Sequence, residues 1–159
     1  MKTFIFDLDH TVIDSSHRQI TLADGSLDLD NWIANCTREK IMADTLLPLA
    51  QHWRTFQAAG NEIVVCTARV MGVWDHVFLA DHGLTADAIL SRPLGCADAD
   101  ADLKENLLRD YARTTGQSWA LFSRTAVMYD DNMGVLNRLS SLGIDCYNAI
   151  SINNTLKAA

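Results

Sequence analysis

The feature that most constrains the fold is a series of short apolar runs, continuous rather than alternating, spaced along almost the whole chain. Consecutive apolar residues are typical of strands covered on both faces, because successive side chains point to opposite sides of a sheet. The expected strands are residues 4–6, 63–66, 88–90, 126–129 and 144–147. Their continuity predicts a sheet buried between two layers.

Helical patterns separate these runs. Apolar residues recur at helical spacing within residues 46–56, 73–84, 103–111 and 135–142, and glycines follow at positions suited to stop each helix, namely Gly60, Gly83, Gly116 and Gly143. Alternating strands and helices imply right-handed crossovers. The sequence therefore predicts an α/β fold: a doubly wound, Rossmann-like, mostly parallel five-stranded sheet with helices on both faces.

Residues 12–44 depart from this alternation. They are polar and turn-rich around residues 21–26, with one short helical pattern from Asp30 to about Met42. A segment of roughly 30 residues is too small to build a core of its own. We therefore expect a single domain over residues 1–159, in which residues 12–44 form a small cap or flap inserted after the first strand.

The charge balance excludes some classes of protein. The formal net charge is −7, and the chain holds 17 Asp but only 3 Glu. Such a chain is unsuited to broad electrostatic binding of nucleic acid, which needs clusters of Lys and Arg. The four cysteines form no CxxC pair, and no apolar run is long enough for a signal-peptide core or a membrane span. We expect a cytoplasmic protein with free thiols and no membrane contact.

Polar residues follow the expected strands, and the carboxyl ends of parallel strands meet at one edge of a sheet. In chain order these residues are Asp7, Asp9 and Thr11, then Thr67 and Arg69, then Arg92, then Asp130 and Asp131. Lys104 lies in the helical pattern before the fourth strand. Singly, each has an ordinary explanation as a helix cap or a solvated surface residue. Together they predict one polar site.

Carboxylates at two strand ends suit a hard divalent cation. Mg²⁺ prefers a few carboxylates together with water and phosphate oxygens. We expect Asp7, Asp130 and Asp131 to hold Mg²⁺, and Asp9 to contribute through its backbone carbonyl. Capping of the following helix by Asp130 and Asp131 remains an alternative.

Four segments in this order resemble a known family. FDLDHT, VVCTAR, the lysine of DLKENLL, and YDDN are similar to the four motifs of the haloacid dehalogenase superfamily of phosphohydrolases. DSSHR, residues 30–32 and ILSRPLG further resemble the 3'-phosphatase domain of phage polynucleotide kinase-phosphatase and its stand-alone relatives. No GxxxxGK[ST] loop occurs, so the resemblance concerns the phosphatase part alone.

The resemblance implies roles for the residues that match the motifs. Asp7 would be the nucleophile that forms an aspartyl phosphate, and Asp9 would be the general acid and base. A phosphate ester fits better than a halide, because a halide leaving group needs no proton. Thr67 and Lys104 would join Mg²⁺ in offsetting charge on the phosphoryl oxygens.

Substrate contacts are less defined by the motifs. The expected substrate-binding residues are His10, Thr11, Arg69 and Arg92, with Thr11 mainly shaping the loop. Arg69 and Arg92 suit a phosphate, although pairing with the many aspartates is the alternative. Trp32 is a candidate for stacking on a base.

His10 is a departure from the family, which usually has glycine at this position. The turn must therefore accept a Cβ atom, and an imidazole enters the neighbourhood of Asp9. A tolerated surface histidine and a residue that contacts substrate or tunes Asp9 both remain open. The stretch from Gly95 to Asp98 also lacks an arginine that the relatives carry, which leaves the substrate open.

The function predicted from these residues is a magnesium-dependent phosphomonoesterase acting on a nucleotide or a nucleic-acid 3'-phosphate end. The alternatives are a phosphatase of another small phosphorylated metabolite, a phosphotransferase or phosphonatase, and a catalytically silent nucleotide-binding module. A response-regulator receiver is disfavoured, because its acidic pair follows the first strand and not the fourth. The sequence does not indicate the oligomeric state.

Overall fold

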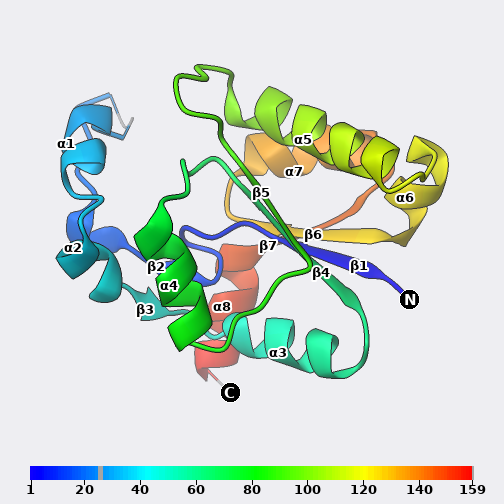
Figure 1. The fold of residues 1–159 in the computed structure, drawn as a ribbon, viewed down its shortest axis with the longest axis horizontal. Helices are drawn as coiled ribbons and strands as arrows, with labels where there is room; N and C mark the ends of the chain where they lie inside the picture. The colour runs from blue at the N-terminus through cyan, green and yellow to red at the C-terminus, as the bar shows by residue number, and fades with distance from the viewer. Residues whose placement is uncertain (25–26, 159) are drawn as a thin grey trace.

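The computed structural model describes residues 1–24 and 27–158, so Gly25 and Ser26 of the turn-rich stretch lie outside the described residues. Its centre is a five-stranded parallel sheet in the order β5-β4-β1-β6-β7 (Figure 1). The strands are β1 (Thr3–Phe6), β4 (Glu62–Thr67), β5 (Ala88–Ser91), β6 (Ala126–Asp130) and β7 (Asp145–Asn148). The expected α/β fold class and its five strands are confirmed.

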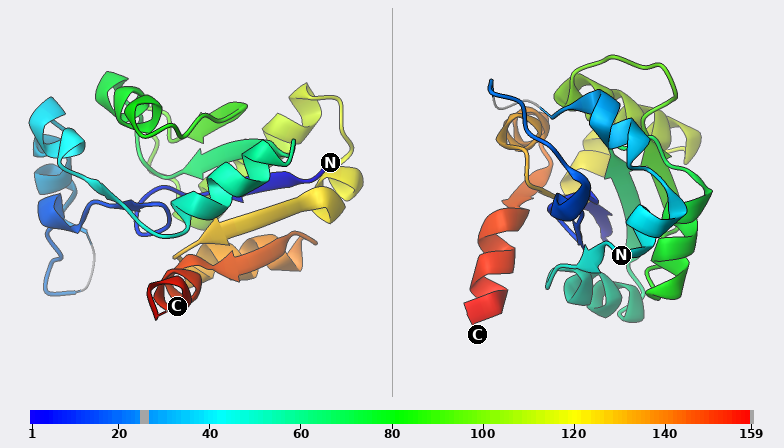
Figure 2. Two further views of the ribbon diagram at one scale, coloured as in Figure 1. Left: turned by 90° about the horizontal axis from the view of Figure 1, so that it is seen from below. Right: turned by 90° about the vertical axis from the view of Figure 1, so that its left-hand side faces the viewer.

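Helices cover both faces of this sheet (Figures 1 and 2). One core cluster joins the sheet to α3 (Ala50–Ala58), α4 (Val73–Asp81) and α8 (Ala149–Ala158). The other joins it to α5 (Asp100–Thr114), α6 (Trp119–Thr125) and α7 (Met133–Ser141). Within the described residues, no helix is both long enough and apolar enough to cross a membrane.

The central strand shows why the apolar runs are continuous. Phe4 and Phe6 of β1 belong to one core cluster and Ile5 belongs to the other. The Phe6 ring stacks on Trp53 and Tyr129, with ring centroids 5.2 and 5.1 Å apart. Because both faces of the strand are buried, it has no solvent-facing position where a polar residue would be favoured.

The segment over residues 12–44 differs from the expected single helix. It contains β2 (Ile13–Asp14), a 3-10 turn η1 (Ser16–Arg18) and two helices, α1 (Leu29–Ala34) and α2 (Arg38–Met42). The helix breaks because Thr37 caps α2 by accepting a hydrogen bond from the Lys40 amide, which starts a new helix. Strand β3 (Thr45–Leu46) pairs with β2 and takes Leu46 out of the helix expected over residues 46–56.

Figure 2 shows α1 and α2 beyond the carboxyl ends of the parallel strands, at the end away from the N-terminus. This is the edge at which the sequence predicts the site. A role for residues 12–44 as a cap or flap, and the single-domain assignment, stay predictions.

Two helices were not expected from the sequence, α6 and α8. Helix α8 follows β7 directly, and its Asn153 is buried. The Asn153 side chain accepts a hydrogen bond from the Leu49 amide at 2.8 Å and donates one to the Thr11 carbonyl at 2.9 Å. Through this residue the last helix fixes the loop that follows β1.

Replacing Asn153 by alanine is expected to lower the free energy of unfolding by about 1–3 kcal/mol, because it leaves two buried backbone groups without partners. Urea unfolding of both proteins measures the change. The exposed neighbour Asn154 is the control, since Asn154→Ala should alter stability by less than about 0.5 kcal/mol. Equal effects of the two substitutions would contradict the anchoring role of Asn153.

Candidate active site

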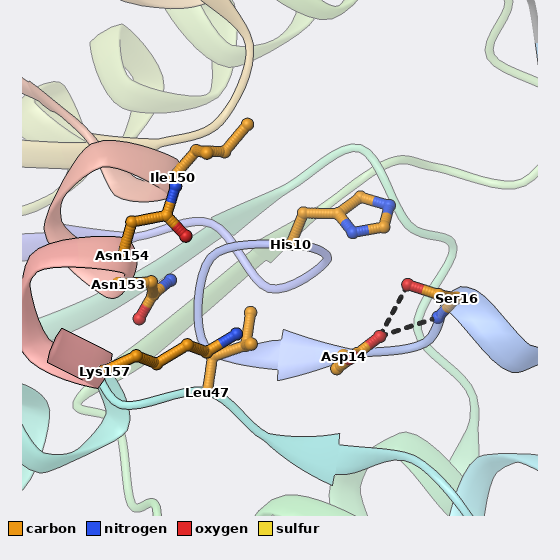
Figure 3. A pocket seen from close by; sticks show the side chains of 8 residues that line it. All are labelled: His10, Asp14, Ser16, Leu47, Ile150, Asn153, Asn154 and Lys157. Carbon is orange, nitrogen blue, oxygen red and sulfur yellow. Dashed lines mark hydrogen bonds between the residues drawn. The ribbon is translucent and has the colours of Figure 1, made fainter.

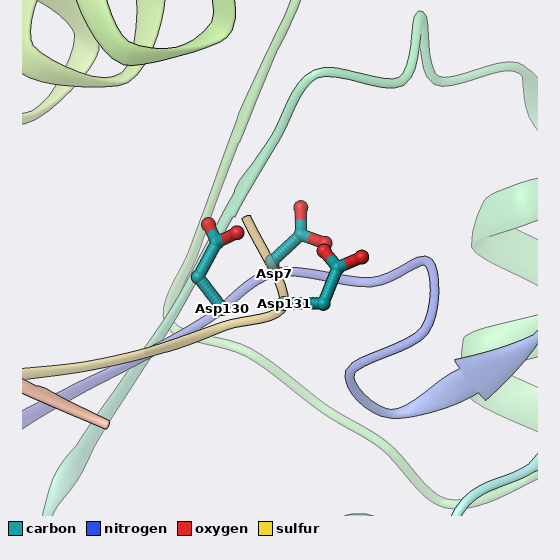
Figure 4. Close-up of side chains that lie close together, drawn as sticks. All are labelled: Asp7, Asp130 and Asp131. Carbon is teal, nitrogen blue, oxygen red and sulfur yellow. The ribbon is translucent and has the colours of Figure 1, made fainter. Parts of the chain in front are cut away.

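Three carboxylates gather at the carboxyl end of the sheet. Asp7 directly follows β1, Asp130 ends the neighbouring β6, and Asp131 comes next. One oxygen from each lies within 4.8 Å of the others, and Figure 4 shows the side chains converging. Asp7 and Asp130 are buried and Asp131 is half-buried. The pairing of β1 with β6 thus brings together residues more than 120 positions apart in the sequence.

Lys104 of α5 reaches into this cluster. Its ammonium is buried and donates hydrogen bonds of 2.7 Å to Asp7 Oδ1 and of 2.7 Å to Asp130 Oδ2. Asp130 Oδ1 accepts a further bond from the Asn132 amide at 2.9 Å. Three ionised carboxylates against one ammonium leave two negative charges, the amount that one divalent cation balances. This hard-oxygen donor set fits Mg²⁺.

Burial governs the ionisation of the cluster. It raises the pKa of Asp7 to about 7, with Lys104 acting in the opposite direction and Asp130 adding to the increase. Burial also raises the pKa of Asp131 to about 6 and shifts the pKa of Asp130 upward. For Lys104, burial lowers the pKa, but the charges of Asp7 and Asp130 outweigh burial and raise it. The protein alone therefore supplies too little positive charge for these carboxylates.

Asp9 lies apart from the three carboxylates and pairs with a different basic side chain, that of Arg69. Its Oδ1 accepts hydrogen bonds from Ser15 Oγ at 2.5 Å and from Arg69 Nη2 at 2.5 Å, and its Oδ2 accepts one from Arg69 Nε at 3.1 Å. Burial acts to raise the pKa of Asp9, but the charge and hydrogen bonds of Arg69 and the bond from Ser15 outweigh it and lower the pKa. Metal binding by the Asp9 carbonyl stays a prediction.

Arg69 is buried within a network of ion pairs. Besides Asp9, its guanidinium donates to Asp75 at 2.5 Å and lies 3.8 Å from Asp44 of the inserted segment. Asp44 in turn accepts two hydrogen bonds of 2.9 Å from Arg18. The network thus links the inserted segment to Asp9. Substrate binding by Arg69 stays a prediction.

Arg92 holds the loop that follows β5. Its guanidinium donates to protein oxygens, which are the carbonyls of Ala68, Cys96 and Asp98 and the carboxylate of Asp100. The sequence predicts Arg92 at the edge of the site. Its guanidinium, however, forms its hydrogen bonds with the loop. A contact between Arg92 and substrate stays a prediction.

The two threonines have different surroundings. Thr67 ends β4, is buried, and accepts a hydrogen bond from the Arg69 amide at 3.1 Å. Thr11 is fully buried, and its Oγ1 is the one buried side-chain oxygen or nitrogen without a partner in residues 1–24 and 27–158. Since the Thr11 carbonyl is bound by Asn153, Thr11 helps to shape the loop. Its contact with substrate stays a prediction.

His10 occupies the turn after Asp9 with φ +57°, the left-handed region, and no other non-glycine residue in the described parts of the chain has a positive φ. The turn thus accepts a Cβ atom, as its sequence requires. A cavity of about 270 Å³ lies beside His10, against α8 (Figure 3). In Figure 3 the imidazole points away from α8, and it contacts Gln19 at 2.9 Å. Contact between His10 and substrate stays a prediction.

Sequence reasoning did not anticipate Ser15, Asp44 or Asp75. Asp44 meets Arg69 only after the chain has folded, and no local pattern marks it. Asp75 stands three residues after Gly72 and accepts its amide hydrogen bond, so it has the pattern of a helix cap. The ring of Trp32 lies 4.1 Å from the Arg18 guanidinium carbon and 5.5 Å from that of Arg69. Stacking of Trp32 on a base stays a prediction.

Solved structures with the same fold include haloacid dehalogenase enzymes. A haloacid dehalogenase-superfamily hydrolase from Geobacter sulfurreducens superposes with a TM-score of 0.63, at 14% identity over 98% of this chain and 99% of that one. A chain in the structure of the Pnkp1/Rnl/Hen1 RNA repair complex superposes with a TM-score of 0.62, at 17% identity over 93% of this chain. This protein spans only 42% of the length of that chain.

Sequence comparison identifies the family. The chain is 31% identical over 170 residues to the 5'-deoxynucleotidase of Escherichia phage T5, covering 98% of this chain and 70% of the relative. The family model described as Bacteriophage T5 5'-deoxynucleotidase matches residues 1–159. The chain therefore belongs to the bacteriophage T5 5'-deoxynucleotidase family and is a phosphatase of the haloacid dehalogenase superfamily.

Proposed function

We propose that this phosphatase is magnesium-dependent and removes the phosphate of deoxynucleoside 5'-monophosphates through an aspartyl phosphate on Asp7. The observation that carries the proposal is the cluster of Asp7, Asp130, Asp131 and Lys104, of which all but the half-buried Asp131 are buried, with Asp9 held separately two residues beyond Asp7. The substrate class is supported by the name of the phage T5 relative.

The two aspartates after β1 divide the chemistry between them. The Asp7 carboxylate attacks phosphorus while the bond from phosphorus to the nucleoside oxygen breaks, and Asp9 gives that oxygen a proton. Asp9, now ionised, takes a proton from a water molecule that attacks the aspartyl phosphate. Inorganic phosphate leaves, and the Asp7 carboxylate is restored.

The remaining groups lower the electrostatic barrier between an anionic nucleophile and an anionic substrate. Asp7, Asp130 and Asp131, with the Asp9 carbonyl, would hold Mg²⁺, which offsets charge on the phosphoryl oxygens when it is bound. The Lys104 ammonium lies 2.7 Å from Asp7 and adds a fixed positive charge at the point of attack. The Thr67 hydroxyl, at the end of β4, would donate to a phosphoryl oxygen.

A nucleotide 5'-phosphate is favoured over the nucleic-acid 3'-phosphate end considered from the sequence. The relative named 5'-deoxynucleotidase shares 31% identity with this chain. The likeness to the RNA repair complex, at 17% identity, concerns the fold. The net charge of −7 also disfavours extended contact with a polynucleotide.

With Mg²⁺ present, the protein is expected to release phosphate faster from deoxynucleoside 5'-monophosphates than from 3'-phosphorylated oligonucleotides or sugar phosphates. Colorimetric phosphate release across the three substrate classes measures this. Asp7→Asn should reduce release to background, because it removes the nucleophile. Activity on sugar phosphates only would refute the nucleotide assignment, and full activity of Asp7→Asn would refute the aspartyl phosphate.

Asp9→Asn is expected to lower turnover by about 10²-fold or more, because the amide can neither give nor take the proton. Binding of Mg²⁺, followed as the rise in melting temperature on adding the metal, should remain close to that of the wild type. If metal binding is lost together with activity, Asp9 acts mainly at the metal site and the acid–base role is wrong.

Lys104→Met in EDTA is expected to lower the free energy of unfolding by about 3–5 kcal/mol, since it leaves buried carboxylates without a cation. Urea unfolding provides the measurement, and added Mg²⁺ should restore part of the loss. Lys40→Met is the matched control, because Lys40 is exposed on α2. A similar, small change in both variants would contradict the role assigned to Lys104.

A further inference from the structure

A chain of hydrogen bonds runs from His10 to Asp9 through two side chains of the inserted segment. His10 Nε2 lies 2.9 Å from Gln19 Oε1. Gln19 Nε2 donates to Ser15 Oγ at 2.9 Å, and Ser15 Oγ donates to Asp9 Oδ1 at 2.5 Å. Ser15 is fully buried, and the other three residues are half-buried. The chain connects the residue that departs from the family pattern to the proposed acid and base.

The ionised Asp9 at one end of the chain determines which atom donates and which accepts in each hydrogen bond. An ionised Asp9 only accepts, so the Ser15 hydroxyl must donate to it. The oxygen of Ser15 is then left to accept, which requires the amide nitrogen of Gln19 on that side. The Gln19 oxygen therefore faces His10, whose Nε2 must carry a hydrogen. All three donors point toward Asp9.

The backbone of His10 supports a role for its side chain. Its φ of +57° is a conformation that glycine adopts without strain and that most side chains avoid. The turn is held by backbone bonds, including the His10 amide to the Ile13 carbonyl at 2.8 Å and the Ile13 amide to the Leu8 carbonyl at 2.9 Å. These bonds do not require an imidazole. A side chain kept in a strained conformation points to a function.

The two oxygens of Asp9 are bound unequally. Among the residues that the structure describes, Oδ1 accepts two hydrogen bonds of 2.5 Å, from Ser15 and Arg69, whereas Oδ2 accepts one, of 3.1 Å from Arg69. Oδ2 is thus the oxygen with capacity left for another partner. If Asp9 is the acid and base proposed above, Oδ2 is the oxygen that carries the proton.

We propose that His10 is a positioning residue for Asp9, acting through Gln19 and Ser15 to hold Oδ1 so that Oδ2 faces the oxygen of the leaving nucleoside. This inference rests on the acid–base role of Asp9 in the proposed function. A carboxamide lies within the chain and does not pass protons, so His10 orients Asp9 and does not supply its proton. The histidine thereby restricts the orientation of the Asp9 carboxylate, which a glycine at this position does not.

The test compares two substrates that differ in their need for an acid. A deoxynucleoside 5'-monophosphate releases an alkoxide that must be protonated, whereas 4-nitrophenyl phosphate releases a nitrophenolate that departs without a proton. His10→Gly is expected to lower kcat/KM for the nucleotide about tenfold, a fraction of a full general-acid contribution. The loss should lie in kcat, with KM unchanged, and kcat/KM for 4-nitrophenyl phosphate should stay within about twofold of the wild type.

Further variants separate positioning from backbone flexibility. His10→Asn keeps a residue that tolerates the left-handed turn, but its shorter side chain does not reach Gln19, so the same loss is expected. Gln19→Met should reproduce the loss, and the double variant His10→Gly with Gln19→Met should lose no more than either single one. Gln117→Met, a change in the loop after α5, is the control and should leave both substrates unaffected.

Thermal unfolding of His10→Gly shows whether the fold persists, and the melting temperature should not fall, because glycine relaxes the turn. Equal losses on both substrates, no loss on either, or additive losses in the double variant would overturn the positioning role. Asp9→Asn distinguishes a failure of the role of His10 from a failure of the acid–base role of Asp9. If Asp9→Asn discriminates between the substrates and His10→Gly does not, only the role of His10 is wrong; if Asp9→Asn does not discriminate, the acid role of Asp9 fails as well.

Discussion

The contact on which the site depends is the Lys104 ammonium, buried at 2.7 Å from both Asp7 and Asp130. Burying a charge is expensive unless it is paired, and carboxylates at neighbouring strand ends repel one another. Lys104 offsets part of the repulsion between Asp7 and Asp130 and part of the cost of burying them. The position of α5 against the sheet therefore determines the charge balance of this cluster as well as the packing of the core.

The charges at the sheet edge form two separate groups with different cations. The first group contains three carboxylates, Asp7, Asp130 and Asp131, but only one lysine, Lys104, among the described residues. Its excess negative charge suits a divalent cation that in turn binds a phosphate. Asp9 has an arginine whose fork binds both of its oxygens. A planar guanidinium fixes the orientation of a carboxylate, whereas an ammonium acts as a point charge. Two aspartates that are two residues apart thereby have different surroundings: Asp7 lies where a divalent cation can bind, and Asp9 is held in a fixed orientation by Arg69.

The strands were predictable because continuous apolar runs report burial on both faces, which is a local property of the sequence. The carboxylates at the strand ends followed from the same pattern, since parallel strands bring their carboxyl ends together. The split into α1 and α2 depends on one cap, Thr37. In α8 the polar Asn153 is buried, at a position where a helical pattern would show an apolar residue. The contact of Asp44 with Arg69 joins residues 25 positions apart in sequence, so only the fold shows it.

His10 shows how local and long-range constraints combine in this site. A strained residue lowers stability and is kept only where the surroundings hold it in place. Here the turn is held by its own backbone hydrogen bonds and by the hydrogen bond that Asn153 of α8 donates to the Thr11 carbonyl. The imidazole is held by its hydrogen bond with Gln19. The inserted segment thus reaches Asp9 by two routes, through Ser15 on one side and through Asp44 and Arg69 on the other. The orientation of Asp9 therefore depends on contacts made by the inserted segment as well as on the strand that precedes it.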